Sequence, residues 1–545
     1  MAKIVTVEQM RAIEKAADAS GLTYAMMMEN AGRGIAQEII DRWPDLDGKR
    51  VAILVGPGNN GGDGLVIGHY LAEAGGQVAI YLAKPREVGD ANLARLQERE
   101  LLIANAEDDQ RWRVLRNMME TVDIVVDALL GTGFRLPLEG VAKKLLKNAG
   151  AAVARRENRP FVVAVDCPSG LDCDTGEIAA EALCADLTVT LAAAKPGLIR
   201  FPGAQSVGEL VVRDIGIAPD QKELAGVDLE MASPQSVSAH LPERPKNAHK
   251  GTFGRAIVVA GSVTFPGAAS LAAVAAYRAG AGLVTVAGPT PIQGLVAPQL
   301  PEVTWILLPH EMGVIAADGV GILEKELESC QALLLGPGFG QDTATADFMR
   351  KMLMPEKRTQ RGKIGFVHTE QGKAKARSGL PPCVIDADGL KLLTKIKNWP
   401  ANLPPDTILT PHPGEMEVLT GEKKDAIQAD RVGVARRWAG EWGHVVVLKG
   451  AFTVVAGSDG RATVLPFATA ALARAGTGDV LAGAIVGLRA QGLQAYEAAV
   501  LGAYLHGRAG ELAAEELGSE MSVLAGDVAE ALPAAVADLH RTRRS

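Results

Sequence analysis

The sequence is poor in aromatic residues, cysteines and long apolar runs, and each shortage excludes a class of protein. Aromatic side chains make up 4% of the 545 residues, and the five cysteines lack the spacing of a zinc site or disulfide framework. No apolar run reaches the roughly 18 residues that a membrane-spanning helix needs. The net charge of −8 argues against a general affinity for nucleic acid. The chain opens on a polar segment without a signal or transit peptide, so we expect a cytoplasmic protein with reduced thiols.

Two catalytic signatures are also absent from the sequence. No Gly-x-x-x-x-Gly-Lys-[Ser/Thr] motif occurs, which excludes a P-loop mechanism, and no His-Glu-x-x-His motif occurs, which argues against a catalytic zinc. The content of 48% hydrophobic and 22% charged residues is typical of a soluble globular protein. The length predicts two large α/β domains or roughly three smaller domains.

The first polar motif is a glycine-rich loop between a predicted strand and a predicted helix. The apolar run 51–55 predicts a buried parallel strand, residues 56–64 read Gly-Pro-Gly-Asn-Asn-Gly-Gly-Asp-Gly, and a helix is expected from Leu65 to Ala74. The loop satisfies Gly-x-Gly-x-x-Gly, but the next predicted strand, 77–82, is not followed by the acidic residue that binds a ribose in dinucleotide sites. Its two asparagines and one aspartate exceed what a simple turn requires.

Further polar side chains follow the carboxyl ends of predicted strands. Asp127 ends one apolar run, and Asp166 and Ser169 follow another. Lys195 lies just beyond a third. Ligands of open parallel sheets bind outside the carboxyl ends of the strands, where Asn60 of the glycine loop is also expected. Converging oxygen atoms suit a hard cation as well as a substrate.

Four motifs in this half resemble the NAD(P)H-hydrate epimerase family. They are Gly-Pro-Gly-Asn-Asn-Gly-Gly-Asp-Gly (56–64), Leu-Leu-Gly-Thr-Gly (129–133), Asp-Cys-Pro-Ser-Gly-Leu-Asp (166–172) and Thr-Leu-Ala-Ala-Ala-Lys-Pro-Gly (190–197). The resemblance implies a Rossmann-like, three-layer domain over residues 1–217. It also implies an enzyme that interconverts the R and S epimers of NADHX and NADPHX, the hydrates of NADH and NADPH.

The same resemblance implies roles for individual residues. The substrate would be bound by Asn59, Asn60, Gly61, Gly62, Asp63, Gly131, Thr132, Gly133, Phe134, Arg135, Leu136, Pro137 and Asp166. A potassium ion would be held by Asn60, Asp127 and Ser169. Our hypothesis is that Asp166 and Lys195 assist proton movement at the C6 hydroxyl group of the hydrate.

The pattern of strands and helices weakens between residues 218 and 248, where prolines mix with polar residues, and this predicts a linker. Over residues 249–540 strands again alternate with helices, which predicts one large α/β domain. A basic, polar stretch at 355–380 is expected to be a surface excursion.

The most informative stretch of the second domain is Ala475-Gly476-Thr477-Gly478-Asp479, together with the apolar helix that follows it. A glycine loop at a helix N-terminus leaves backbone N–H groups free to hold an anion such as a phosphate. Asp479 would lie beside that anion and act as a base on a hydroxyl group during phosphoryl transfer. The alternative is an acid that merely stabilises the helix, with simple turns at His412 and Lys449.

Motifs of the second half resemble the NAD(P)H-hydrate dehydratase family of the ribokinase-like superfamily. They are Lys-Gly-Thr-Phe-Gly (250–254), Pro-Gly-Ala-Ala (266–269), Arg278 with Gly-Ala-Gly-Leu-Val (280–284), Gly-Pro-Gly (336–338), His-Pro-Gly-Glu (412–415), Lys-Gly-Ala-Phe-Thr (449–453) and Gly-Thr-Gly-Asp (476–479). Sugar kinases share the Gly-x-Gly-Asp loop but not His-Pro-Gly-Glu. The resemblance implies a ribokinase-like α/β domain that uses ADP and Mg²⁺ to convert the S hydrate to NAD(P)H.

This resemblance also implies site residues. The hydrate would contact Ala268, Gly338, His412 and Asp479, with Asp479 as the general base. The nucleotide would contact Lys449, Gly450, Ala451, Phe452, Thr453, Gly476, Thr477 and Gly478, where the glycine amides stabilise the moving phosphoryl group.

Two other functions stay open at this point. One is a small-molecule kinase with an inactive first half, and the other is a nucleotide-binding module without catalysis. On the repair interpretation, the expected partners are the small molecules NADHX, NADPHX and ADP, without nucleic acid or membrane, and the chain forms a homo-oligomer.

Overall fold

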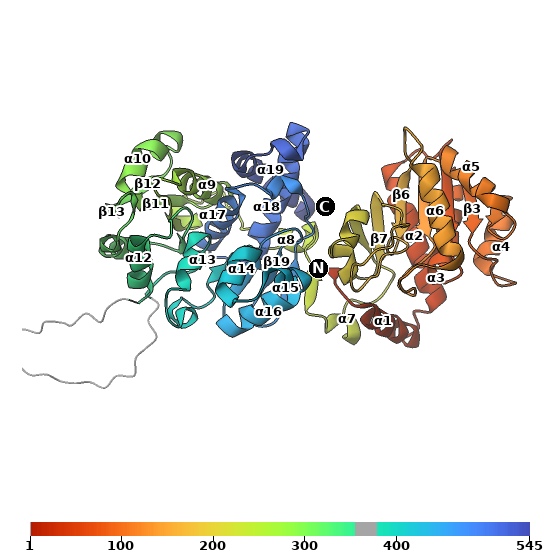
Figure 1. Cartoon of the computed structure of the whole chain (residues 1–545), viewed down its shortest axis with the longest axis horizontal. Helices are drawn as coiled ribbons and strands as arrows, with labels where there is room; N and C mark the ends of the chain where they lie inside the picture. Colours follow the sequence, from red (N-terminus) through yellow and green to blue (C-terminus); the bar gives the residue numbers. More distant parts are fainter. Residues whose placement is uncertain (1, 355–378, 545) are drawn as a thin grey trace, which may run out of the picture. The chain divides into compact units, whose positions relative to one another are not determined.

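The computed structural model describes residues 2–354 and 379–544, which divide into two compact units, 2–231 and 232–544. Figure 1 colours the first unit from red to yellow and the second from green to blue. The division falls inside the stretch predicted as a linker, whose residues form helix α7, strand β9 and helix α8. Residues 355–378 of the predicted surface excursion lie outside the described residues. No helix in the described ranges is long and apolar enough to cross a membrane.

The first unit contains a parallel sheet of seven strands in the order β4-β3-β2-β5-β6-β7-β8. Its strands are β2 (Arg50–Val55), β3 (Gln77–Leu82), β4 (Leu102–Asn105), β5 (Ile124–Ala128), β6 (Phe161–Val165), β7 (Leu187–Leu191) and β8 (Glu209–Arg213). The helices are α1 (Val7–Ala19), α2 (Tyr24–Arg42), α3 (Asn59–Glu73), α4 (Ala91–Gln97), α5 (Arg113–Thr121), α6 (Gly140–Val153) and α7 (Lys222–Ala225). The short strands β1 (Ala2–Lys3) and β9 (Leu229–Met231) pair antiparallel.

Both faces of this sheet are covered by helices. Successive side chains of a strand point to opposite faces, so each strand contributes to two cores. In β2, Ile53 packs with residues of α2 and α3, whereas Leu54 packs with residues of α5 and α6. Burial on both faces explains why the strands are continuous apolar runs in the sequence. The predicted three-layer α/β architecture is confirmed.

The second unit contains strands in the order β20-β19-β18-β17-β16-β15-β10-β11-β12, parallel from β18 to β12, with β19 and β20 antiparallel. They are β10 (Arg255–Val259), β11 (Leu283–Pro289), β12 (Thr304–Leu308), β15 (Ala332–Leu335), β16 (Cys383–Ile385), β17 (Ile408–Leu409), β18 (Val445–Leu448), β19 (Val454–Ala456) and β20 (Ala462–Val464). A separate small hairpin joins β13 (His310–Glu311) and β14 (Val314–Ile315).

Helices cover both faces of this second sheet as well, so the predicted α/β class is confirmed here too. They are α8 (Pro234–Ser238), α9 (Pro266–Arg278), α10 (Thr290–Val296), α11 (Val320–Leu327), α12 (Thr343–Leu353), α13 (Asp388–Leu393), α14 (Pro413–Thr420), α15 (Lys424–Ala429), α16 (Arg431–Trp442), α17 (Thr477–Ala490), α18 (Ala495–Leu517) and α19 (Ala525–Arg544).

Helices α9 and α17 pack backbone to backbone and lie side by side in Figure 1. A Cβ atom at Gly483 would lie 2.2 Å from the carbonyl oxygen of Ala272, and one at Gly487 would lie 2.5 Å from that of Ala276. Only glycine fits at this distance, and the alanine-rich face of α9 lets α17 approach. The contact fixes helix α17, whose first turn carries the predicted phosphate loop.

One predicted helix boundary is wrong. Helix α3 begins at Asn59 rather than near Leu65, so Asn60, Gly61 and Asp63 lie inside its first turns. The prediction began the helix at the first regularly spaced apolar residue, because glycine has a low helix propensity. Close packing overrides this propensity, since a Cβ atom at Gly61 would lie 2.0 Å from the carbonyl oxygen of Gly56.

The contact between α9 and α17 can be tested by enlarging Gly483. Gly483→Val should lower the free energy of unfolding by roughly 1–3 kcal/mol or more, because its side chain would overlap the backbone of Ala272. Urea titration followed by tryptophan fluorescence measures this change as a lower midpoint.

Gly440 in α16 supplies the matched control, because a Cβ atom there would meet no atom within 4 Å. Gly440→Ala should leave stability unchanged or raise it by about 0.4–1 kcal/mol. An unchanged midpoint in Gly483→Val would contradict the close packing.

Candidate active sites

The first candidate site is organised around a buried ion pair between Asp166 and Lys195. Asp166 follows β6 with a positive φ of 65°, and Lys195, 1% exposed, lies beyond β7. Lys195 Nζ donates hydrogen bonds to Asp166 Oδ1, to Thr190 Oγ1 at 3.0 Å and to the carbonyl oxygen of Leu191 at 3.1 Å. Thr190 Oγ1 also donates to Asp166 Oδ1 at 3.0 Å. The structure therefore brings these two predicted catalytic residues together.

Two more carboxyl groups are influenced by this pair. Burial raises the pKa of Asp63 well above its ordinary value, and the charges of Asp166 and Glu14 raise it further against the opposing effect of Lys195. The pKa of Glu14, on α1, is also raised, first by burial. The sequence analysis missed Glu14, because it lies on a polar stretch of helix without a motif. The site therefore combines an ion pair with two carboxyl groups whose pKa values are raised by burial.

The predicted potassium ligands Asp127 and Ser169 are in direct contact. Ser169 Oγ donates to Asp127 Oδ1 at 2.6 Å, and the backbone N–H of Ser169 donates to Oδ2 at 2.9 Å. Burial raises the pKa of Asp127, although these hydrogen bonds lower it. Asn60 is buried, and its side-chain nitrogen has no hydrogen-bond partner in the described part of the chain. A Cβ atom at Gly131 would lie 3.3 Å from Asn60 Cγ, which places the loop after β5 against the start of α3.

The remaining predicted substrate residues of this unit line the same end of the sheet. Asn59 is exposed at the start of α3, and residues 131–137 form a partly exposed loop after β5. Two residues without a predicted role hold the glycine loop. Arg86 Nη1 donates to the carbonyl oxygens of Gly56 and Gly58, each at 3.1 Å, and a Cβ atom at Gly62 would lie 2.6 Å from Met28 Cε.

A second lysine–aspartate pair organises the candidate site of the second unit. Lys449 follows β18, Asp386 follows β16, and Lys449 Nζ donates to Asp386 Oδ1 at 2.6 Å. Glu415 Oε2 lies 3.6 Å from the same nitrogen. Burial alone would lower the pKa of Lys449, but Asp386 and Glu415 outweigh it and raise the pKa. Asp386 Oδ2 is buried and has no hydrogen-bond partner in the described ranges.

The phosphate loop lies directly on this ion pair. A Cβ atom at Gly478 would lie 3.3 Å from Lys449 Nζ and 3.8 Å from Asp386 Oδ2. Gly476, with φ 92°, is the N-cap of α17, and Asp479 is in its first turn. The pKa of Asp479 is raised to about 7, first by burial and then by the charge of Asp386, against the lowering effect of Lys449. Asp479 therefore lies beside a helix N-terminus with a proton affinity suited to a general base.

The predicted hydrate contacts occupy three positions around this loop. Gly338, with φ 65°, packs on α9, where a Cβ atom would lie 2.8 Å from Ala268 Cβ. His412 caps α14, since its Nδ1 accepts from the backbone N–H groups of Gly414 at 3.0 Å and Glu415 at 3.2 Å. The structure thus gives His412 a local function as a helix cap, whereas the alternative interpretation expected a simple turn. Because His412 is exposed, its ring is accessible to a substrate, and the predicted substrate contact stays a prediction.

A cavity of about 170 Å³ adjoins the lysine–aspartate pair. It is lined by Lys449, Gly450, Ala451, Thr453, Phe467, Thr469, Leu472, Ala473, Thr477, Gly478, Leu481 and His506. Most of the predicted nucleotide residues are in this lining, whereas Phe452 and Gly476 are not. The sequence analysis missed Phe467, Thr469, Leu472 and His506, because they come from the segment before α17 and from α18, outside every motif.

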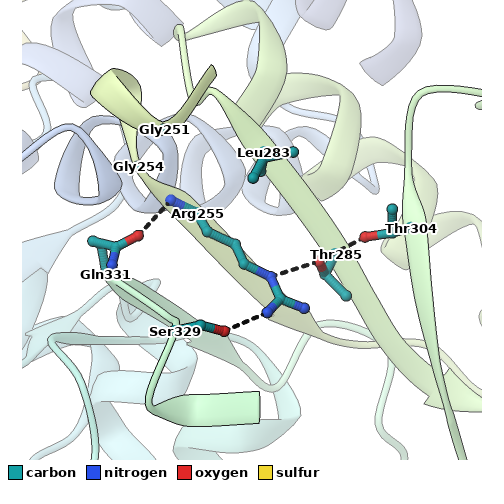
Figure 2. A pocket seen from close by; sticks show the side chains of 8 residues that line it. All are labelled: Gly251, Gly254, Arg255, Leu283, Thr285, Thr304, Ser329 and Gln331. Carbon is teal, nitrogen blue, oxygen red and sulfur yellow. Dashed lines mark hydrogen bonds between the residues drawn. The ribbon is translucent and has the colours of Figure 1, made fainter. Parts of the chain in front are cut away.

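A larger cavity of about 580 Å³ lies at the amino ends of strands β10, β11 and β12 of the same sheet, opposite to their carboxyl ends (Figure 2). Its main charged group, Arg255, donates from Nε to Thr285 Oγ1 at 3.0 Å and from Nη1 to Ser329 Oγ at 2.5 Å. Glu326 pairs with the same guanidinium group at 3.1 Å. We place the candidate active site at the smaller cavity, because the strand-end residues and the phosphate loop meet there.

Comparisons with known proteins find relatives of both halves of the chain. Two family profiles match, one described as YjeF-related protein N-terminus over residues 24–197 and one as NAD(P)H-hydrate dehydratase over residues 256–534. The bifunctional NAD(P)H-hydrate repair enzyme Nnr of Moorella thermoacetica is 36% identical over 540 residues, covering 97% of this chain and 96% of that protein. The protein of the same name from Coxiella burnetii is 32% identical, covering 95% of this chain and 96% of its own.

Among solved structures, the ADP/ATP-dependent NAD(P)H-hydrate dehydratase of Bacillus subtilis, co-crystallized with ATP and Mg²⁺, aligns with a TM-score of 0.46 at 30% identity. The alignment covers 58% of this chain and 100% of that chain. The family resemblance stated from the motifs is confirmed by relatives that match nearly the whole chain. With both halves matched in one polypeptide, the chain belongs to the family of bifunctional NAD(P)H-hydrate repair enzymes.

Proposed function

We propose that this chain repairs hydrated nicotinamide cofactors. The first unit exchanges the R and S epimers of NADHX and NADPHX, and the second unit dehydrates the S epimer to NADH or NADPH at the expense of ADP. The family supports both activities, and one observation carries the second, namely Asp479, whose pKa is raised to about 7, at the N-terminus of α17. A homo-oligomer and a cytoplasmic location stay predictions.

In the second unit, Asp479 accepts the proton of the C6 hydroxyl group while that oxygen attacks the terminal phosphorus of ADP. The backbone N–H groups at the start of α17 and the ammonium group of Lys449 stabilise the charge on the transferred phosphoryl group. AMP leaves, and phosphorylation makes the C6 oxygen a good leaving group. The electron pair of the ring nitrogen expels phosphate, and loss of the C5 proton restores the dihydropyridine.

The residues of this site fit a magnesium ion. Asp386 Oδ2 is a buried carboxylate oxygen without a partner in the described ranges, and hard cations prefer such oxygens. The described residues contain no group of three or more acidic, histidine or cysteine side chains that could hold a metal by themselves. The phosphates of the nucleotide would therefore complete the coordination, as is usual for Mg²⁺. When bound, the ion neutralises phosphate charge.

In the first unit, Asp166 and Lys195 are the groups that move the proton at the C6 hydroxyl. Removal of this proton lets the bond between C6 and the ring nitrogen open to an aldehyde, and closure of the ring on the other face, with return of the proton, gives the other epimer. Their buried contact holds both side chains at the carboxyl end of the sheet, where the substrate is expected. Asn60, Asp127 and Ser169 offer the oxygen ligands that hard cations prefer, and the contact between Asp127 and Ser169 already brings two of these ligands together, so the residues fit a potassium ion. When bound, the ion supplies positive charge beside the substrate oxygen.

One incubation distinguishes repair from a kinase reaction. A mixed R/S hydrate is incubated with ADP, ATP or no nucleotide, and reduced-nicotinamide absorbance and free phosphate are followed. Repair predicts full recovery of the cofactor with release of phosphate, with ADP preferred over ATP. A stable phosphorylated product would identify a kinase, and recovery of about half the mixture would contradict the epimerase assignment.

The general base gives the first prediction on activity. Asp479→Asn should lower kcat/KM for dehydration of the S hydrate by roughly 10²- to 10⁴-fold, because the amide cannot accept the proton. In the unsubstituted chain, kcat/KM should rise with pH and level off above about 7, because only the ionised form of Asp479 is a base. Initial rates from below to above this pKa measure both effects.

Asp425 is the control, because it is an exposed acid in the first turn of α15. Asp425→Asn should keep the rate and the pH profile. If Asp479→Asn retained the activity of the unsubstituted chain, Asp479 would not be the base.

The ion pair of the first unit gives a separate prediction. Asp166→Asn should slow R/S exchange by roughly 10²- to 10⁴-fold, because the partner of Lys195 loses its charge and its proton-accepting oxygen. Exchange is measured by nuclear magnetic resonance or chromatography of a purified epimer. Dehydration of purified S hydrate should continue at its normal rate.

The exposed Asp41 of α2 serves as the control for this experiment. Asp41→Asn should leave exchange unchanged, and Asp479→Asn should slow dehydration while exchange persists. Normal exchange in Asp166→Asn would refute the proposed function of this pair.

A further inference from the structure

His506 is a buried histidine of α18 that lines the nucleotide cavity and belongs to none of the motifs. Its side chain is 8% exposed. It shares the cavity wall with Lys449 and Gly478 at the phosphate end and with Phe467 and Leu472 among the apolar residues. The lining therefore combines the charged group of Lys449, which suits phosphates, with apolar side chains that suit a base, and the imidazole ring of His506 belongs to the same lining.

The two ring nitrogens of His506 differ in their hydrogen-bond partners. The ring makes a hydrogen bond with the backbone of Thr477, and this bond raises the pKa of His506, as a bond from a ring N–H to a carbonyl oxygen does. Nε2 is buried and has no hydrogen-bond partner in the described residues. The bond to Thr477 is therefore made by Nδ1, and Nε2 is the unpartnered nitrogen.

The charge of the ring decides what Nε2 can do. The pKa of His506 is lowered to about 4, first by burial, with Lys449 also lowering it, while Thr477 and Asp386 act in the opposite direction. The ring is therefore neutral at pH 7, and its one proton is on Nδ1. Nε2 carries a lone pair and is a hydrogen-bond acceptor. Buried acceptors of this kind are almost always paired in native proteins.

An adenine nucleotide offers few partners for an acceptor. Its phosphates only accept hydrogen bonds at neutral pH, so the available donors are the ribose hydroxyl groups and the amino group of adenine. We propose that Nε2 of His506 accepts a hydrogen bond from the nucleoside part of the nucleotide and selects nucleotides that carry this donor. The inference rests on the proposed binding of a nucleotide in this cavity. It adds the residue that recognises the nucleoside part by a hydrogen bond.

Binding of nucleotide analogues to the full chain tests this inference without turnover. Calorimetric titrations compare ADP with 2′-deoxy-ADP and 3′-deoxy-ADP, which each lack one hydroxyl group, and with IDP, which lacks the amino group. The unsubstituted chain should bind one of these analogues roughly tenfold to a hundredfold more weakly than ADP. That analogue identifies the donor. Equal binding of ADP and all three analogues would overturn the inference.

The variant His506→Leu should bind ADP as weakly as that analogue and should no longer distinguish the two. His506→Asn retains a side-chain acceptor and should recover part of the discrimination. A merely structural function would weaken ADP and every analogue by the same factor, and that result would overturn the inference. R/S exchange and the urea midpoint report whether each variant is folded.

His444 supplies a matched control in the same unit. It is 3% exposed and also has one unpartnered ring nitrogen among the described residues, but it lies at the start of β18, where Nε2 contacts the carbonyl oxygen of Pro400. His444→Leu should keep the discrimination between nucleotides.

Discrimination between nucleotides without any dehydration would refute the proposed function and support the role of His506. Absence of nucleotide binding would refute both.

Discussion

Both candidate sites depend on a buried lysine–aspartate pair at the carboxyl end of a parallel sheet. Burial of one charge alone is costly, and a buried pair is tolerated when its remaining hydrogen bonds are satisfied. Lys195 meets this condition through Thr190 and Leu191, in addition to Asp166. Lys449 is shared between Asp386 and Glu415. Each pair joins the loops that follow two different strands, so it fixes the relative positions of the groups around it.

Each pair also influences the pKa of a further carboxyl group. Asp63 and Asp479 have raised pKa values for the same reasons, namely burial first and then a neighbouring aspartate, with the lysine opposing them. Two carboxyl groups beside one cation do not share its stabilisation equally. The aspartate in contact with the lysine is its ion-pair partner, and the more distant carboxyl group keeps a raised pKa, which for Asp479 is about 7.

The sequence predicted the parts of these sites that follow apolar strands or form glycine loops, because both features leave local patterns. Asp166, Lys195, Lys449 and the loop before Asp479 were found in this way. Glu14 and His506 were not found, because each reaches its site from a helix distant in sequence, and only the packing of that helix brings it there. The predicted start of α3 was wrong for a related reason. Contacts with Gly56 stabilise a glycine-rich first turn that the low helix propensity of glycine disfavours.

The two proposed reactions differ in what they demand of a site, and the structures differ accordingly. Exchange of epimers inverts the configuration at C6 without a second substrate. A bond to C6 breaks and re-forms, so the first unit needs an acid–base pair that removes and returns the proton of the C6 hydroxyl group. Dehydration is coupled to phosphoryl transfer, so the second unit also needs backbone N–H groups for a phosphate and a cavity for the nucleoside. Removal of the S epimer at the expense of ADP draws the R epimer through the first reaction. The two units can therefore cooperate through their shared substrate without any conformational signal between them.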